Sequence, residues 1–181
     1  MTTIDQARRF AEIAHAGQTR KGAARVPYVT HLAEVAALVA EFGGSPVAIM
    51  AAWLHDTVED CGTSPDEIAR QFGPDVAWVV AQLTDDKSLP KAERKALQIL
   101  HAPGKTHDAA LVKICDKLSN VNAVGDAPAV HWDEARQVAY LDWAEQVVSA
   151  LPGGAALARD RFAAALARSR RMVGERRARS A

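Results

Sequence analysis

One apolar run that ends in a cluster of polar residues constrains the chain more than any other feature. Residues 47–60 read VAIMAAWLHDTVED, so eight apolar residues are followed by an imidazole and three carboxylates. On a helix, His55 and Glu59 share one face at i,i+4 spacing, and so do Asp56 and Asp60. This pattern predicts a metal site beside a water-activating acid, and a solvated last turn of helix is the alternative.

Two residues elsewhere in the chain could complete such a metal site. His31 lies in an apolar helical stretch, and Asp116 lies beside Ile114 on the inward face of another. A buried aspartate is costly unless it is paired or bound to a metal. Taken singly, His31 could be an ordinary core or surface histidine, and Asp116 could pair with a neighbouring lysine. Together with His55 and Asp56, they predict one shared site.

The predicted ligand set indicates the class of metal. Two imidazoles and two carboxylates favour Mn²⁺, Fe²⁺ or Zn²⁺ over Ca²⁺, which takes oxygen ligands. The set contains no thiolate, so a structural zinc site is not expected. The cysteines, Cys61 and Cys115, lack metal-type spacing and are expected to be reduced thiols.

Start and stop signals of helices recur along the whole chain, and no segment shows the sustained alternation typical of a strand. With 181 residues, the chain is long enough for one domain. We therefore predict an all-α single domain, a bundle of eight to nine helices. The expected helices cover approximately residues 3–15, 30–42, 45–60, 64–72, 74–83, 88–100, 107–124, 132–151 and 155–172.

Charge is unevenly distributed, although the net charge is +0. Residues 168–181 contain six arginines and one glutamate, so we predict a domain over residues 1–167 and an arginine-rich tail over residues 168–181. No aromatic residues interleave with these arginines, so the tail is expected to be solvated and not to bind nucleic acid. No apolar run approaches the roughly 18 residues of a membrane span, and the N-terminus does not resemble a signal peptide. We expect a cytoplasmic protein without a membrane partner.

Several segments resemble the hydrolase domain of the RelA/SpoT alarmone enzymes, within the HD phosphohydrolase superfamily. They are AHAGQTRK at 14–21, PYVTH at 27–31, AWLHDTVED at 52–60, FGPDV at 72–76 and LVKICDKLSN at 111–120. The segment TDDKSLPKAERK at 84–95 is similar to the stand-alone small alarmone hydrolases, typified by the metazoan SpoT homologue. The resemblance covers about residues 4–167 and implies an HD-domain helical bundle.

This resemblance implies a Mn²⁺-dependent hydrolase of the stringent response, with Zn²⁺ or Fe²⁺ as alternative ions. The enzyme would remove the 3′-pyrophosphate from guanosine tetra- or pentaphosphate, (p)ppGpp, and release GDP or GTP. Glu59 and Asp60 would form the catalytic acidic pair that activates water. The implied metal ligands are His31, His55, Asp56 and Asp116.

The resemblance also implies a set of substrate-binding residues. Arg20 and Lys21 would form a basic loop whose arginine stacks on the purine, as a planar guanidinium can. Asn120 would lie near the ribose. Without the resemblance, Lys91 and Arg136 would be ordinary solvated charges on helices. The residues implied to hold phosphates or the ribose are Lys91, Arg136 and Tyr140.

Four positions depart from the family pattern around the ribose and the base: Cys115, Ser119, Asn122 and Ala123. They leave the substrate open, so an HD-type phosphatase acting on NADPH or another nucleotide is an alternative. A non-catalytic nucleotide-binding module is a third hypothesis, which the acidic pair argues against. In each case the expected partner is a small nucleotide, and the oligomeric state is not predicted.

Overall fold

The computed structural model describes residues 3–180, apart from the side chains of residues 177, 179 and 180. Within this range the chain is helical, its β pairing is limited to two isolated bridges, and the all-α prediction is confirmed. No helix in this range is long and apolar enough to cross a membrane. The elements are α1 (Ile4–Ala14), α2 (Val29–Glu41), α3 (Pro46–Leu54), α4 (Thr57–Cys61), α5 (Pro65–Phe72), α6 (Pro74–Leu83), α7 (Lys91–Leu100), the short 3₁₀ helix η1 (Ala102–Gly104), α8 (His107–Asp126), α9 (Glu134–Ala150) and α10 (Ala156–Ser180).

Local capping residues explain where most of these helices begin. Thr3 and Gln6 form a reciprocal capping box at α1, and Ser45 and Ser64 accept backbone N–H groups at α3 and α5. Ser88 was expected to cap α7, but the N-cap is Pro90, two residues later. The Ser88 backbone N–H donates to Asp86 Oδ1 in a turn, and the helix begins after Pro90.

The expected central helix is divided into α3 and α4 at His55 and Asp56. The His55 ring binds the Ala52 carbonyl oxygen through Nδ1 at 2.8 Å, and the Thr57 hydroxyl donates to the Leu54 carbonyl at 2.7 Å. These side chains bind carbonyl groups of the preceding turn and so compete with the backbone ladder of a continuous helix. The break therefore lies in the predicted metal-binding dipeptide itself.

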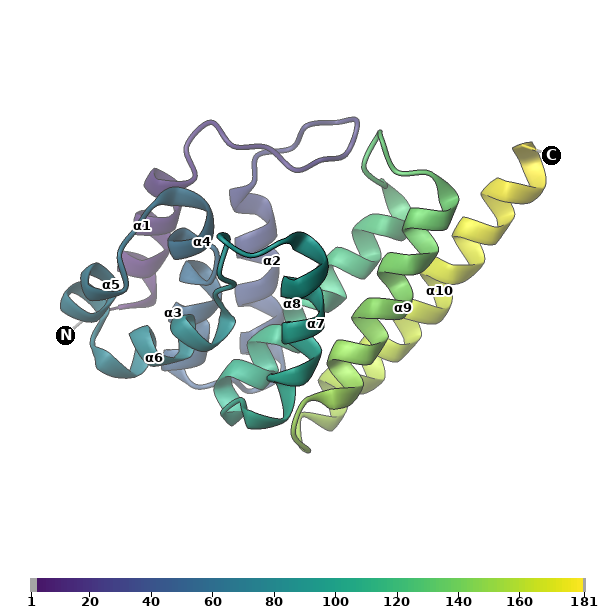
Figure 1. Ribbon diagram of the computed structural model, residues 1–181. Coiled ribbons are helices and arrows are strands. Elements are labelled where there is room, and N and C mark those ends of the chain that lie inside the picture. Colours follow the sequence, from purple (N-terminus) through teal and green to yellow (C-terminus); the bar gives the residue numbers. More distant parts are fainter. Residues whose placement is uncertain (1–2, 181) are drawn as a thin grey trace.

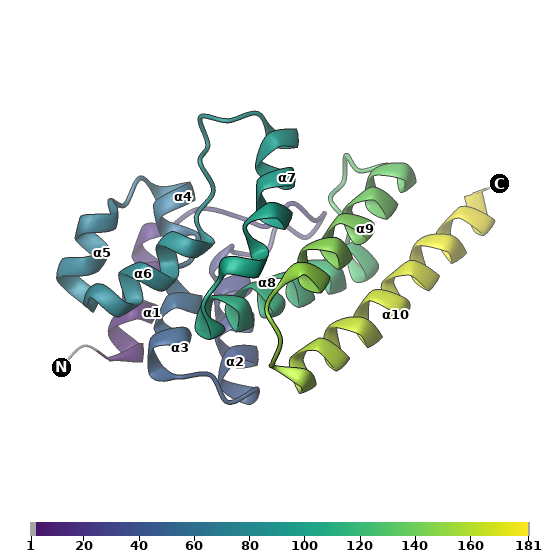
Figure 2. The ribbon, with the colours of Figure 1, turned by 60° about the horizontal axis from the view of Figure 1, so that its bottom comes forward.

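Helix α8 runs through the middle of the molecule and is buried along most of its length. Helices α2, α3 and α6 pack on one side of it, while α9 and α10 pack on the other. Figure 1 shows α1 and α3–α6 gathered at one end of the molecule, and α9 and α10 lying side by side at the other. The rotated view in Figure 2 shows the same division, with α8 between the two groups.

Helix α10 continues to Ser180, beyond its expected end near residue 172. Ser169 and Val173 are buried, and the Ser169 hydroxyl donates to the Val121 carbonyl of α8 at 2.9 Å. A Cβ atom on Gly125 would lie 2.6 Å from Ser169 Oγ, so glycine is required where the two helices approach. The predicted boundary at residue 167 stays a prediction, and the helix passes through it without a break.

Candidate active site

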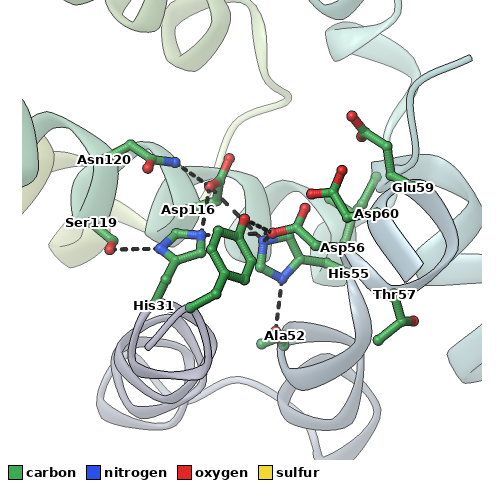
Figure 3. A network of polar contacts seen from close by, with 12 residues as sticks. His31, Ala52, His55, Asp56, Thr57, Glu59, Asp60, Asp116, Ser119 and Asn120 are labelled. Atoms are coloured by element: carbon green, nitrogen blue, oxygen red, sulfur yellow. Dashed lines mark hydrogen bonds and ion pairs between the residues drawn. The ribbon is translucent and has the colours of Figure 1, made fainter. Parts of the chain in front are cut away.

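Three predicted metal ligands, His31, His55 and Asp116, converge although they come from different helices. Their ligand atoms all lie within 4.8 Å of one another, and the three side chains are buried. His31 Nε2 is 3.3 Å from Asp116 Oδ1, and His55 Nε2 is 4.0 Å from the same oxygen. Figure 3 shows both imidazole rings directed toward this carboxylate. The arrangement matches the mixed nitrogen and oxygen set expected from the sequence.

Asp56 lies beside this trio. Its Oδ2 atom is 3.1 Å from His55 Nε2 and 3.9 Å from His31 Nε2. The same oxygen accepts a hydrogen bond from the Tyr28 hydroxyl at 2.6 Å. Because Tyr28 holds one carboxylate oxygen near both imidazoles, Asp56 is placed to act as a further ligand, and that role stays a prediction.

Hydrogen bonds at Nδ1 orient both imidazole rings. The Ala52 carbonyl oxygen can only accept, so His55 Nδ1 carries the proton and Nε2 keeps its lone pair. His31 Nδ1 lies 2.9 Å from Ser119 Oγ, whose hydroxyl donates to Glu34 Oε2 at 2.6 Å. His31 Nδ1 is therefore the donor to Ser119. Both Nε2 atoms therefore face the site, where a neutral imidazole offers its Nε2 lone pair to a metal ion.

The donor set fits a divalent cation. His55 Nε2 is buried without a hydrogen-bond partner, so its lone pair is directed into the site with no protein proton to receive. Asp116 is also buried, and its Oδ1 accepts from the Asn120 amide at 2.6 Å. Burial acts to raise the pKa of Asp116, but Lys117, His31 and Lys113 outweigh it and hold this pKa well below its usual range. A carboxylate and two imidazoles are ligands that suit such an ion.

The two acidic residues Glu59 and Asp60 lie on α4, next to the predicted ligands. Glu59 Oε2 accepts the backbone N–H of Asp85 at 3.3 Å, and Arg94 Nη1 lies 3.5 Å from Glu59 Oε1. Lys87 forms an ion pair with Asp60 and lies 3.8 Å from Glu59 Oε1. Burial raises the pKa of Glu59, and the nearby carboxylate of Asp85 adds to the effect. Only 17% of the Glu59 side chain is exposed, which argues against a simply solvated helix end.

A cleft of 820 Å³ opens beside the buried histidines and carboxylates. It is lined by several cations of α7 and α9, by residues of α2 and α8 and by the loop before α2. The cleft is lined by all the residues that were predicted to bind substrate and by the acidic pair, namely Arg20, Lys21, Glu59, Asp60, Lys91, Asn120, Arg136 and Tyr140.

The cations on the α7 and α9 wall lie close together. Burial lowers the pKa of Lys91, and the neighbouring charges of Arg136 and Lys21 lower it further. Burial also lowers the pKa of Lys95, with Lys91 contributing again. The Arg136 guanidinium lies over the Trp132 ring, 4.9 Å from its centroid. Cations that repel one another in a cleft are typical of a site for a polyanion.

Some neighbours of these residues were not predicted from the sequence. They are Tyr28 beside Asp56, Lys87 beside the acidic pair, and the connected pair Ser119 and Glu34 behind His31. Glu34 also forms an ion pair with Arg20, whose Nη1 atom lies 3.2 Å from Glu34 Oε2. The arginine that was predicted to stack on the purine is therefore paired with a carboxylate in this structure. The i,i+3 spacing of His31 and Glu34 on one helix was the signal available in the sequence.

Comparison with known proteins gives consistent matches over most of the chain. Residues 7–141 match the HD domain family. The chain is 43% identical over 152 residues to the guanosine-3′,5′-bis(diphosphate) 3′-pyrophosphohydrolase MESH1 of Xenopus tropicalis, covering 83% of this chain and 85% of the relative. Identity to the human MESH1 is 42% over 146 residues, covering 80% and 82%.

A solved structure shows the same arrangement of helices. It is that of a metazoan ortholog of SpoT that hydrolyses ppGpp, and it superposes with a TM-score of 0.82 at 34% identity. The match covers 88% of this chain and 92% of that chain.

Proposed function

Because the chain belongs to the HD domain family, and within it to the small alarmone hydrolases of the RelA/SpoT type, we propose that it hydrolyses (p)ppGpp. The reaction would cleave the bond between the ribose 3′ oxygen and the adjacent phosphorus, with water supplying the new oxygen of the released pyrophosphate. The other product is GDP or GTP.

The observation that carries this proposal is the junction of a metal-type cluster with a cationic cleft. The ligand atoms of His31, His55 and Asp116 lie within 4.8 Å of one another. The cleft beside them presents Lys91, Arg136 and other cations together with Glu59 and Asp60. A polyphosphate substrate needs this combination of charge neutralisation and an activated water.

We propose that His31, His55, Asp56 and Asp116 hold one divalent ion, with Mn²⁺ as the expected metal and Zn²⁺ or Fe²⁺ as alternatives. When bound, such an ion supplies Lewis-acid activation of water and neutralises substrate charge.

Glu59 would accept the proton of the attacking water, and Asp60 would orient that water. The raised pKa of Glu59 makes its carboxylate a stronger base than an ordinary glutamate, provided that it is ionised at the working pH. Arg94 and the backbone N–H of Asp85 restrain this carboxylate. These two contacts would keep the base aimed at one point.

The cationic wall would bind the phosphates. Lys91 and Arg136 line the cleft and would neutralise charge on the pyrophosphate, while Tyr140 and Asn120 would line the space for the ribose. In this proposal Arg20 and Lys21 approach the base. The acidic pair lies on α4 beside the metal cluster, so a substrate that spans the cleft would present its phosphates to both.

Product analysis tests this function directly. The protein is stripped with a chelator, reloaded with Mn²⁺ and given guanosine tetraphosphate or NADPH in separate reactions. The proposal expects GDP and pyrophosphate from the first reaction and little phosphate from the second. Phosphate from NADPH without any GDP would overturn it in favour of a different nucleotide phosphatase.

Metal binding is measured separately from turnover. Titration of Mn²⁺ into Asp116→Asn should show a large loss of affinity compared with the unsubstituted protein, because a buried carboxylate of the cluster is removed. Asp142→Asn on the outer face of α9 is the matched control, and its affinity should not change. Equal Mn²⁺ affinity in all three proteins would exclude the proposed ligand set.

A further inference from the structure

Glu34 places a carboxylate in the wall of the cleft one helical turn after His31. Its Oε2 atom accepts the Ser119 hydroxyl at 2.6 Å and Arg20 Nη1 at 3.2 Å. Its side chain is 38% exposed, and the residue lines the cleft. Among the residues that the structure describes, the other oxygen, Oε1, has no hydrogen-bond partner. Glu34 therefore offers an acceptor to whatever occupies this part of the cleft.

The charge of Glu34 determines which part of a nucleotide can lie against it. A phosphate beside this carboxylate would be repelled. Lys91 and Arg136, the cations that suit phosphates, belong to α7 and α9, whereas Glu34 belongs to α2. Glu34 itself contacts Arg20 and Ser119. The base and the ribose hydroxyls are the parts of a nucleotide that carry hydrogen-bond donors without negative charge. Because the ribose is assigned to other residues of the cleft, we assign the base to Glu34.

The edges of the purines differ in a way that a carboxylate can read. Guanine presents two adjacent donors, the N1–H group and the 2-amino group, and a carboxylate oxygen is a strong acceptor for both. Adenine presents an unprotonated N1 at the same place, and two acceptors facing each other are unfavourable. A carboxylate oxygen without a hydrogen-bond partner in the wall of a site thus favours guanine over adenine.

We propose that Glu34 is a specificity-determining residue that selects guanine nucleotides through its free Oε1 atom. This inference rests on the proposed function, because Arg20 must lie against the base for Glu34 to reach its edge. Oε2 remains on the Ser119 hydroxyl, which fixes the carboxylate while Oε1 accepts from N1–H. The same contact links base recognition to His31, since Ser119 also accepts from the Nδ1 of that histidine.

A series of bases in the substrate tests the assignment. Guanosine, inosine and adenosine 3′,5′-bis(diphosphates) are compared by kcat/KM, since inosine keeps N1–H but lacks the amino group. The unsubstituted protein should prefer guanosine over adenosine by about 10- to 100-fold, with inosine between them. Equal kcat/KM for all three bases in this protein would overturn the proposal without any variant.

Glu34→Gln is the decisive variant, because it keeps the size of the side chain and replaces one acceptor by a donor. An amide can donate to adenine N1 and accept from its 6-amino group, so the preference for guanosine should fall at least about tenfold. Ser119→Ala is the matched control. It removes the support of His31 and one of the two hydrogen bonds to Glu34 Oε2, but it leaves the carboxylate and its Arg20 contact, so kcat should fall for every base while guanosine is still preferred over adenosine.

The outcomes separate base reading from support of the metal ligand. If Glu34→Gln lowers kcat equally for all bases and leaves the ratio unchanged, Glu34 acts only through Ser119 and the proposal is wrong. Calorimetric binding of GDP and ADP to both proteins gives a readout without turnover. A preference for GDP that is lost in Glu34→Gln would support the assignment even if no pyrophosphate were released, in which case the proposed function alone would fail.

Discussion

Two groups of basic residues in this protein differ in how their charge is balanced. On the outer side of the molecule, Arg170 of α10 contacts Asp142 and Glu145 of α9 at 2.6 and 2.7 Å. Arg168 of the same helix pairs with Asp126. In the cleft, no ion pair with an acid is found for Lys91 among the described residues, and neighbouring cations and burial depress its pKa.

The difference teaches that pairing, and not the density of basic residues, marks an anion site. The sequence concentrates arginines at the C-terminus, yet Arg168 and Arg170 there are paired with carboxylates of α8 and α9. In the cleft, Arg20 and Arg94 are also paired, with Glu34 and Glu59. Lys91 and Lys95 instead lie near other cations, Arg136 among them, and so are repelled. Such an arrangement is unfavourable by itself and becomes favourable when a polyanion binds.

The strongest consequence of this contrast concerns the carboxylate that faces the cleft. Glu59→Gln should lower kcat by about 10²- to 10⁴-fold, because the amide cannot accept a proton from water. The control is Glu145→Gln, which removes a carboxylate paired with Arg170 and should leave kcat unchanged. Steady-state kinetics of both variants, together with a measurement of their bound Mn²⁺, checks this expectation. Near-normal turnover of Glu59→Gln would show that Glu59 does not activate the water.

Removal of one cation from each group tests the contrast itself. Lys91→Ala should raise the KM for guanosine tetraphosphate about tenfold or more, since a hydrogen bond to a charged group contributes about 1.5–3 kcal/mol. Arg170→Ala should leave KM unchanged, because its charge is already neutralised at a distance from the cleft. An equal rise of KM in both variants would mean that overall charge, and not the cleft, governs binding.

The pH dependence of KM should report the depressed pKa of Lys91. The pKa of this amine is lowered from its ordinary value of 10.5, mainly by burial and further by the charges of Arg136 and Lys21. Its positive charge is therefore lost at a lower pH than in a solvated lysine. KM should rise correspondingly early on the alkaline side. In Lys91→Arg the guanidinium stays charged, so this limb should flatten, and an unchanged profile would contradict the assignment.

The smallest effect is expected on the outer side of the molecule. Arg170→Ala should lower the free energy of unfolding by at most about 1 kcal/mol, because exposed ion pairs are weak. The loss should shrink as salt is added. Chemical denaturation at low and high ionic strength measures this, and a loss several times larger would show that these arginines do more than balance charge.

Much of the fold could be predicted because its determinants are local. Capping residues such as Ser45 and Ser64, and apolar stripes at helical spacing, define most of the helices without reference to the rest of the chain. The cluster of His31, His55 and Asp116 was also predictable. Each lies in an apolar stretch, and burying such a group needs a partner.

The parts that escaped prediction depend on contacts between distant helices. Nothing near Glu34 in the sequence indicates that Ser119 would link it to His31, because that contact requires α2 and α8 to be packed. The end of α10 was placed too early for a related reason. An arginine-rich segment has little apolar periodicity of its own. Beyond residue 172 the helix is held by the buried side chain of Val173 and by Arg176, which donates to the carbonyl oxygens of Gly125 and Val124 on α8.

The position of Asp116 on the central helix also bears on how activity returns after denaturation. Its partners His31 and His55 belong to the N-terminal part of the chain, so the cluster is made of contacts between residues far apart in sequence. Contacts of this kind form late in folding, because the intervening chain must first be ordered. In a refolding experiment, recovery of turnover should therefore lag behind recovery of the helical circular dichroism signal. The rate at which turnover returns would then report the docking of α8 onto the N-terminal helices.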